Sequence, residues 1–322
     1  MEKKDLRIVF FGTPDFAVES LRRLVEGGYN IVGVVTMPDK PAGRGHHMYQ
    51  SDVKRYALAQ GLPLLQPVKL KDEAFVDALR SLRADLQIVI AFRMLPEVVW
   101  AMPRLGTFNL HASLLPKYRG AAPINWAVMN GDTETGVTTF FLKHEIDTGD
   151  IIEQRKIPIA RTDNVEIVHD KLMHLGAQMV IDTVDSIIDG TVKTTPQAQM
   201  LTAGQQPTPA PKIFKDTCRI DWNRTAEALY NHVRGLSPYP AAWTEIVDAT
   251  GKAHSTKVFA TGQPQAKPEG ELPGTITSDG RHLWVACADG RLEITQLQVA
   301  GKKRMPADAF LRGFKIEDAH CD

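Results

Sequence analysis

The sequence predicts an α/β protein with a Rossmann-like, doubly wound sheet, followed by a linker and a small OB-like β-barrel. Short apolar strands alternate with amphipathic helices through the first half, a pattern typical of a parallel sheet covered on both faces. The next segment is rich in Thr, Gln, Pro and Ala and has no hydrophobic periodicity. Short β-like runs separated by turn residues follow it. We expect a first domain over 1–190, a linker over 191–211 and a second domain over 212–322.

The first domain begins with a strand over Leu6–Phe11, which stops at the turn Gly12-Thr13-Pro14-Asp15. A helix follows, because apolar residues recur on one helical face: Ala17, Leu21, Leu24 and Val25. Short apolar runs assign the remaining strands, and the helical repeat assigns the remaining helices. We expect strands over Ile31–Thr36, Leu86–Phe92, Thr107–His111, Val137–Leu142 and Ile151–Ile159, and helices over Ser51–Gln60, Asp72–Leu82 and Val165–Met179.

The second domain opens with a helical pattern over Thr225–Arg234 and then changes to short β-like runs. Turn residues such as Asp279-Gly280 and Asp289-Gly290 separate these runs. Five short strands in so small a domain indicate a barrel of the oligonucleotide-binding type. The expected strands are Ala242–Val247, Thr256–Thr261, Gly274–Thr277, His282–Ala286 and Leu292–Leu297.

Composition excludes several classes of protein. The 322 residues are 43% hydrophobic and 24% charged, which is typical of a soluble protein with a sizeable core. The formal net charge is zero, so a nucleic-acid partner would have to be bound by local basic patches. Cys218, Cys287 and Cys321 are far apart, which argues against a disulfide framework and favours the cytoplasm. Because no apolar run approaches the ~20 residues of a membrane span, we expect no membrane contact. We also expect a monomer.

The turn over Gly12–Phe16 lies between a strand and a helix, where a doubly wound sheet can bind a phosphate. A dinucleotide fingerprint needs three glycines at fixed spacing, and this turn has only one. Pro14 also removes a backbone donor. We therefore interpret the turn as structural, with Asp15 near the helix N-terminus, and we disfavour a nicotinamide-dependent dehydrogenase.

Asn109 and His111 alternate along the end of a predicted strand, so their side chains point to the same face of the sheet. The carboxyl edge of such strands is where α/β sheets bind ligands. An amide donor beside an imidazole suits the stabilisation of a developing oxyanion. A structural hydrogen-bonding role is the alternative for each residue alone, but the apolar Leu114-Leu115-Pro116 that follows favours a site.

Two further segments are weaker candidates. Asp147 lies in a tight turn between two strands, where a carboxylate usually bonds backbone amides, and spacing alone does not make it catalytic. The segment 38–47 is rich in glycine, proline and basic side chains, and we interpret it primarily as an exposed loop. We expect no metal there, because the adjacent His46 and His47 rarely orient both rings at one ion.

These segments resemble the methionyl-tRNA formyltransferase family from Ile8 to about Phe310. The most specific part, Asn109-Leu110-His111-Ala112-Ser113-Leu114-Leu115-Pro116, is similar to a motif shared by folate-dependent formyltransferases. Ile146-Asp147-Thr148-Gly149-Asp150 is similar to their second motif. The segments 12–16, 38–45 and 220–222 are similar to segments typical of the tRNA enzymes. The resemblance implies the formyltransferase fold.

The resemblance also implies an activity, the transfer of a formyl group from 10-formyltetrahydrofolate to the amino group of methionine on initiator methionyl-tRNA. No metal is required, because an amine is already a nucleophile. By resemblance, the catalytic residues are Asn109, His111 and Asp147, and the folate site is lined by Ser113, Leu114, Leu115 and Pro116. The residues that we expect to contact tRNA are Lys40, Arg44, His46 and His47 near the acceptor end, and Lys302, Lys303 and Arg304 of the barrel.

The sequence departs from the family pattern in two places. Many relatives carry Ala-Tyr-Gly where this chain has Ala91-Phe92-Arg93, which changes a wall of the implied folate pocket. Relatives often carry lysine after Gly45, where this chain has His46-His47. The positive charge of that loop would therefore depend on pH.

The hypothesis for the mechanism is attack of the methionyl amine on the formyl carbon. Asn109 donates a hydrogen bond to the resulting oxyanion, and His111 is the candidate for a second. Asp147, alone or through a water, accepts the amine proton or holds His111 in the required tautomer.

Three rivals share parts of this pattern. A formyltransferase acting on a small amino-sugar nucleotide shares the Asn-Leu-His and Ser-Leu-Leu-Pro segments, but the loop around Arg44 argues against it. Glycinamide ribonucleotide formyltransferase is generally a single domain. A non-catalytic folate- or RNA-binding module would have no need of all three polar residues of the implied catalytic group.

Overall fold

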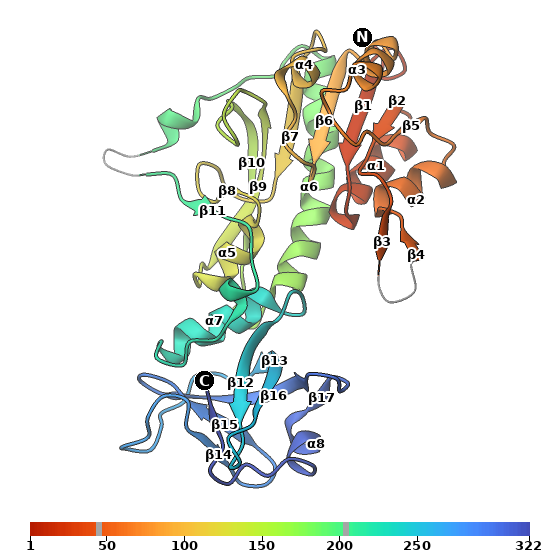
Figure 1. Ribbon diagram of the computed structural model, residues 1–322. Coiled ribbons are helices and arrows are strands. Elements are labelled where there is room, and N and C mark those ends of the chain that lie inside the picture. The colour runs from red at the N-terminus through yellow and green to blue at the C-terminus, as the bar shows by residue number, and fades with distance from the viewer. Residues whose placement is uncertain (43–46, 202–205) are drawn as a thin grey trace. The chain divides into compact units, whose positions relative to one another are not determined.

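The computed structural model describes residues 1–42, 47–201 and 206–322 (Figure 1). Backbone contacts group the chain into two compact units, each made of segments that are not consecutive. Unit 1 comprises 1–120, 135–157 and 169–209, and unit 2 comprises 121–134, 158–168 and 210–322. The domain boundaries 1–190, 191–211 and 212–322 stay a prediction.

Unit 1 contains a seven-stranded sheet in the order β10-β9-β7-β6-β1-β2-β5. Its central strands are parallel, which confirms the Rossmann-like sheet. The reversal of strand order around β1 is the doubly wound pattern. The strands are β1 (Arg7–Gly12), β2 (Asn30–Val35), β5 (Leu64–Leu65), β6 (Leu86–Ile90), β7 (Thr107–His111), β9 (Glu134–Phe141) and β10 (Ile151–Pro158).

One edge of this sheet differs from the expectation of a parallel arrangement. Strand β9 runs antiparallel to β7, with Asn109 opposite Phe140 and His111 opposite Thr138. The apolar run that predicts β9 indicates a buried strand, but it carries no information on direction. The ladder places β9 directly beside the two polar residues at the end of β7.

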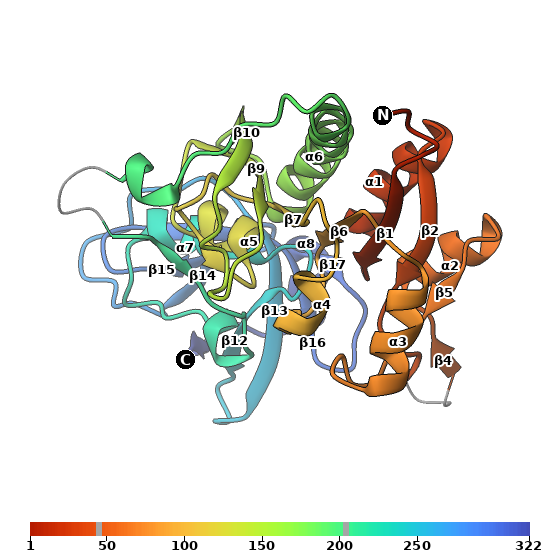
Figure 2. The same cartoon turned by 90° about the horizontal axis from the view of Figure 1, so that it is seen from above.

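Helices cover both faces of the parallel strands (Figure 2). On one face, Phe75, Val76 and Leu79 of α3 share a buried cluster with Val9 and Phe11 of β1. On the other face, α1 and α6 lie together. The helices of unit 1 are α1 (Asp15–Glu26), α2 (Asp52–Ala59), α3 (Glu73–Ser81), α4 (Glu97–Trp100) and most of α6 (Val165–Ile188).

Glycine allows α6 to approach the sheet beside the candidate site. A Cβ added at Gly176 would lie 2.7 Å from the side chain of Leu110 in β7. Leu110 therefore faces α6, and its neighbours Asn109 and His111 face the opposite side of the sheet. This placement agrees with the alternation predicted from the sequence.

The predicted loop over 38–47 is partly a hairpin. Strands β3 (Lys40–Ala42) and β4 (His47–Tyr49) pair antiparallel, with Lys40 opposite Tyr49. The loop reading is therefore wrong for residues 40–42 and for His47, because a run of three residues is too short to show a strand pattern in the sequence. Arg44 and His46 lie outside the described residues.

Unit 2 contains an antiparallel sheet in the order β14-β15-β16-β13-β12-β18, with β17 paired to β16. An isolated bridge between Thr275, next to β14, and His320 of β18 joins the two ends of this order and closes a barrel. All five predicted strands are confirmed. The strands are β12 (Ala242–Val247), β13 (Ala253–Thr261), β14 (Ile276–Ser278), β15 (Leu283–Ala286), β16 (Arg291–Val299), β17 (Met305–Pro306) and β18 (His320–Cys321).

Helix packing completes unit 2. Helix α7 (Ala226–Leu236) begins after Thr225, whose side chain accepts a hydrogen bond from the Ala228 N–H and so caps the helix. Helix α5 (Pro123–Met129) packs on α7, since the Asn125 side chain donates to the Gly235 carbonyl and Met129 joins the barrel core. The remaining short elements are β8 (Arg119–Gly120), η1 (Gln197–Met200), β11 (Pro209–Ala210), η2 (Asp216–Cys218) and α8 (Ala307–Leu311).

Within the described ranges, no helix combines the length and the apolar character that crossing a bilayer requires.

Candidate functional site

The end of strand β7 carries the polar pair predicted from the sequence. Asn109 is half-buried, and among the described residues none hydrogen-bonds to its side-chain amide. His111 is 7% exposed, and its ring meets that of Phe140 edge-on at 6.5 Å between centroids. The amide thus keeps a free donor beside an imidazole that is held by its surroundings.

His111 is oriented by a backbone carbonyl. Its Nε2 lies 2.8 Å from the carbonyl oxygen of Tyr118, which can only accept a hydrogen bond. The Nε2 atom therefore carries a proton, and the exchangeable nitrogen is Nδ1. Tyr118 itself is 2% exposed and has a φ of 61°, so a strained backbone presents this carbonyl.

The carboxylate of Asp147 faces the exchangeable nitrogen of His111. Its Oδ2 lies 3.8 Å from His111 Nδ1, close enough for charge stabilisation and too long for a direct hydrogen bond. The same oxygen accepts a hydrogen bond from the Gly120 N–H at 2.9 Å. Asp147 has a φ of 54°, a left-handed conformation that Asp adopts more readily than most residues.

The turn that carries Asp147 is tightly folded. A Cβ added at Gly149 would lie 1.6 Å from the Phe141 carbonyl oxygen, so only glycine fits there. The Gln197 side chain donates to the carbonyls of Asp147 and Gly149, each at 2.8 Å. The structure therefore brings Asp147 to the polar pair, although dozens of positions separate them along the chain.

The segment implied to bind folate follows His111 directly. Ser113 is fully buried, and its hydroxyl donates to the Lys117 carbonyl at 2.6 Å, so it holds the loop. Thr138 of β9 bonds this loop twice, because its hydroxyl donates to the Ser113 carbonyl and accepts from the Leu115 N–H. Gln154 of β10 adds a bond of 2.7 Å to the Leu115 carbonyl.

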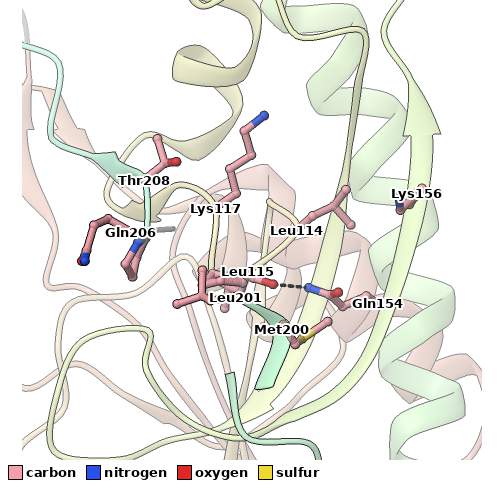
Figure 3. A pocket seen from close by; sticks show the side chains of 11 residues that line it. Leu114, Leu115, Lys117, Gln154, Lys156, Met200, Leu201, Gln206 and Thr208 are labelled. Carbon is pink, nitrogen blue, oxygen red and sulfur yellow. Dashed lines mark hydrogen bonds between the residues drawn. The ribbon is translucent and has the colours of Figure 1, made fainter. Parts of the chain in front are cut away.

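Three of the four implied folate residues line a hollow of about 320 Å³ (Figure 3). Gln154 donates to the Leu115 carbonyl beside this hollow, and Lys117 and Lys156 are its cationic lining residues. Its full lining is Leu114, Leu115, Pro116, Lys117, Gln154, Lys156, Met200, Leu201, Gln206, Pro207 and Thr208.

A second, larger hollow of about 620 Å³ adjoins the loop after β6. Arg93 donates to the carbonyls of Val68 and Pro67, and burial lowers the pKa of its guanidinium. The departure from the family pattern at this position therefore introduces a side chain that ties two loops together. The hollow is lined by Val68, Lys69, Leu70, Lys71, Arg93, Met94, Pro96, Glu97 and Val98.

The predicted tRNA contacts are only partly described. Lys40 is exposed in β3, His47 begins β4, and Arg44 and His46 lie outside the described residues. Lys302 and Lys303 are exposed in unit 2. Arg304 is exposed too, but its guanidinium donates to Gln296 and lies 4.4 Å from the ring of Phe259.

Two buried cysteines and the absence of a metal cluster narrow the alternatives to this site among the described residues. Burial raises the pKa of the Cys287 and Cys321 thiols to about 12, which makes both unreactive. Groups of His, Cys, Asp or Glu suited to a metal ion are absent from the described residues.

Sequence reasoning missed the residues that hold the site in place. Thr138 and Gln154 lie in predicted strands, but the sequence of a strand does not show which residues its polar side chains contact. Gln197 lies in the predicted linker, where the lack of periodicity hides its contacts. Gly120 was within reach, because it belongs to the segment that follows the implied folate motif.

The chain matches known protein families over most of its length. A family model described as formyl transferase matches residues 6–184, and one described as formyl transferase, C-terminal domain, matches residues 212–315. The methionyl-tRNA formyltransferase of Bacteroides fragilis is 65% identical over 320 residues, covering 99% of this chain and 98% of that protein. That of Porphyromonas gingivalis is 49% identical over 318 residues, covering 98% of each.

Solved structures with this fold are more distant in sequence. The N-formyltransferase from Helicobacter canadensis, bound to folinic acid and dTDP-3-aminofucose, has a TM-score of 0.63 at 18% identity, covering 92% of this chain and all of that one. HypX from Aquifex aeolicus, in complex with tetrahydrofolic acid, has a TM-score of 0.63 at 20% identity, covering 97% of this chain and 48% of that one. At these identities, the likeness shows the fold alone.

Proposed function

Because the chain belongs to the methionyl-tRNA formyltransferase family, we propose that Asn109, His111 and Asp147 carry out its formyl transfer. The enzyme transfers the formyl group of 10-formyltetrahydrofolate to the amino group of methionine on initiator methionyl-tRNA. A small amino-sugar nucleotide is not favoured as acceptor, because the tRNA enzymes are far more similar to this chain. The observation that supports the catalytic assignment is the approach of Asp147 Oδ2 to His111 Nδ1.

Asn109 is the proposed oxyanion donor. Its amide is half-buried at the carboxyl end of β7 and has no bond to another described residue. A donor that is fixed by a strand and not otherwise engaged can stabilise charge on the formyl oxygen without first breaking a bond.

His111 is the proposed proton carrier. Since Nε2–H is engaged by the Tyr118 carbonyl, the neutral ring presents a lone pair at Nδ1. This atom accepts the proton that the amine loses as the new C–N bond forms. His111 then returns the proton to the folate nitrogen as the old C–N bond breaks, so the enzyme ends each turnover unchanged.

Asp147 is the proposed partner of the transient imidazolium. Its carboxylate faces Nδ1, so it stabilises the ring while the ring carries the extra proton. His111 can donate to the oxyanion only while Nδ1 is protonated, because its Nε2–H remains bound to the Tyr118 carbonyl. The two roles proposed for His111 therefore occur in sequence.

The folate is proposed to contact Ser113, Leu114, Leu115 and Pro116, as the family motif implies. The apolar wall and cationic rim of the smaller hollow suit a molecule that has an aromatic ring and carboxylates. Leu114→Trp should fill that hollow and raise KM for 10-formyltetrahydrofolate, whereas Met94→Trp in the larger hollow should not. A rise in KM for Met94→Trp alone would place the folate in the larger hollow.

The tRNA is proposed to contact Lys40, Arg44, His46 and His47 near its acceptor end, and Lys302, Lys303 and Arg304 along its body. The exposure of Lys40, Lys302 and Lys303 supports this assignment. We further propose that the enzyme acts as a monomer, and that it works in the cytoplasm, where buried free thiols remain reduced. Sedimentation across a range of protein concentrations tests the monomer.

The central test is formylation of purified methionyl-tRNA with and without 10-formyltetrahydrofolate. We expect product only when the folate is present, and a loss of kcat on the order of 10²–10³ for Asn109→Ala, the typical cost of removing an oxyanion donor. Asp147→Ala should also abolish most turnover. Asn109→Ala should keep the wild-type unfolding temperature, and near-wild-type rates in both variants would refute the catalytic assignment.

A further inference from the structure

Gln197 lies in η1, inside the segment predicted as a linker, yet its side chain is only 3% exposed. Every hydrogen-bonding position of its amide is used. The Nε2 group donates to the Asp147 carbonyl and to the Gly149 carbonyl, each at 2.8 Å. The Oε1 atom accepts from Arg119 Nε at 3.2 Å and from Arg119 Nη2 at 2.7 Å.

These bonds join the two loops that meet at the Asp147 carboxylate. On one side, Gln197 holds the turn that contains Asp147 and Gly149. On the other side, it holds Arg119, whose neighbour Gly120 donates its N–H to Asp147 Oδ2. One amide therefore sets both the position of the carboxylate and the position of the N–H that orients it.

The turn needs this support, because its own backbone is in an uncommon conformation. Asp147 has a φ of 54°, and Gly149 packs its Cα against the Phe141 carbonyl with no room for a side chain. The bond between the Thr148 hydroxyl and the Glu145 carbonyl is exposed and lies within the turn itself. Gln197 supplies less exposed bonds from outside the turn.

We propose that Gln197 is a positioning residue, which holds the Asp147 carboxylate where it faces His111 Nδ1. This inference rests on the catalytic role proposed for Asp147. A segment with no regular periodicity thus contributes to the chemistry, although Gln197 touches neither substrate nor reacting atom in the proposal.

The donor and acceptor halves of the amide can be tested separately. Gln197→Glu keeps the size of the side chain and the partnership with Arg119, but it can no longer donate to the two carbonyls. Gln197→Met has similar length and removes both halves. Gln199 lies in the same short helix and is exposed, so Gln199→Glu and Gln199→Met are matched controls.

The experiment measures kcat and both KM values for each variant, alone and combined with Asp147→Asn, together with the unfolding temperature. A displaced catalytic group costs on the order of 10² in rate, so we expect Gln197→Glu to lose about that factor in kcat at unchanged KM. In the Asp147→Asn background, the same change should cost almost nothing, because the group that it positions is already disabled. The Gln199 variants should match the wild type.

Two results would overturn the inference. Equal losses of kcat in both backgrounds would mean that Gln197 acts independently of Asp147. Wild-type kcat in Gln197→Glu and Gln197→Met would mean that the hydrogen bonds of Gln197 are not needed for turnover. Wild-type turnover in Asp147→Asn alone would instead refute the proposed function of Asp147, and the inference with it. The Asp147→Asn variant alone therefore distinguishes failure of the role proposed for Asp147 from failure of the role proposed for Gln197.

Discussion

The imidazole of His111 has only one nitrogen available for chemistry, since Nε2–H is bound to the Tyr118 carbonyl. If Nδ1 is the proton acceptor, a variant that cannot accept a proton must rely on hydroxide. We therefore expect His111→Gln to lose on the order of 10²–10⁴ in kcat and to recover part of it as pH rises.

Asn109→Ala provides the comparison for this pH experiment. It lacks an oxyanion donor but keeps the proton carrier, so its deficit in kcat should stay nearly constant from about pH 6.5 to about pH 9. Parallel pH profiles of kcat for the two variants would contradict the assignment of His111 as the proton carrier.

His232 of α7 makes stability depend on pH. Burial lowers its pKa to about 4, from the ordinary value near 6.5, and its Nδ1 is buried without a partner among the described residues. Between these two values the unfolded chain binds the proton and the folded chain does not, so stability falls as pH drops from about 6.5 to about 4. The difference corresponds to about 3 kcal/mol in total.

The measurement is the free energy of unfolding of the whole enzyme in urea at several pH values within that window. We expect His232→Gln to show a shallower dependence on pH than the wild type. Because other groups titrate in both proteins, only the difference between the two curves is informative. Identical slopes would show that His232 is protonated in the folded state as readily as in the unfolded chain.

At the scale of elements, the turn between β9 and β10 depends on one glycine. A side chain at position 149 would collide with the Phe141 carbonyl, which is backbone and cannot move aside easily. We expect Gly149→Ala to cost more than about 2 kcal/mol of stability or, if the turn rearranges instead, to abolish turnover by displacing Asp147.

Thermal unfolding and kcat together check this prediction. Gly313→Ala is the control, because nothing lies within 4 Å of a Cβ added there and its φ is not positive. If Gly149→Ala matched this control in both stability and kcat, the turn would be looser than the contacts with Phe141 indicate.

The elements differ in how far they could be predicted. Strands β7 and β12 have the expected bounds, because apolar alternation and flanking turn residues mark both of their ends. The two-residue strand β8 and the single-turn helix α4 were missed, because no periodicity develops over so short a length. Strand direction at the β9 edge was also out of reach, since it depends on partners distant in the sequence.

The candidate site shows the same division. Asn109 and His111 could be placed together from strand alternation, whereas Asp147 entered only through the family resemblance. Gln197 could not be found at all, because a glutamine in an aperiodic segment has many possible partners. Local patterns therefore predicted the residues on one element, and only tertiary contacts revealed the residues that position them.

At the scale of the whole molecule, the formal net charge of zero means that tRNA affinity must come from local groups. Lys303 is exposed in unit 2 and lies between Lys302 and Arg304. If it contacts a phosphate, Lys303→Ala should weaken tRNA binding and reduce the slope of log K against log salt by about 1. The value of kcat at saturating tRNA should be unchanged.

Lys4 is also exposed but lies near the N-terminus of unit 1, so Lys4→Ala is the matched control. Binding measured by filter retention at several salt concentrations distinguishes the two variants. A salt slope for Lys303→Ala equal to that of Lys4→Ala would remove Lys303 from the proposed tRNA surface.

The threading of the chain limits how such enzymes can exchange parts during evolution. Met129 belongs to the barrel core, although it lies before α6 in the sequence and far upstream of residue 212. A gene fusion that grafted residues 212–322 onto another protein would leave behind α5 and expose the α7 surface that it covers. Transfer of this barrel to another protein as an independent domain would therefore require a replacement for α5.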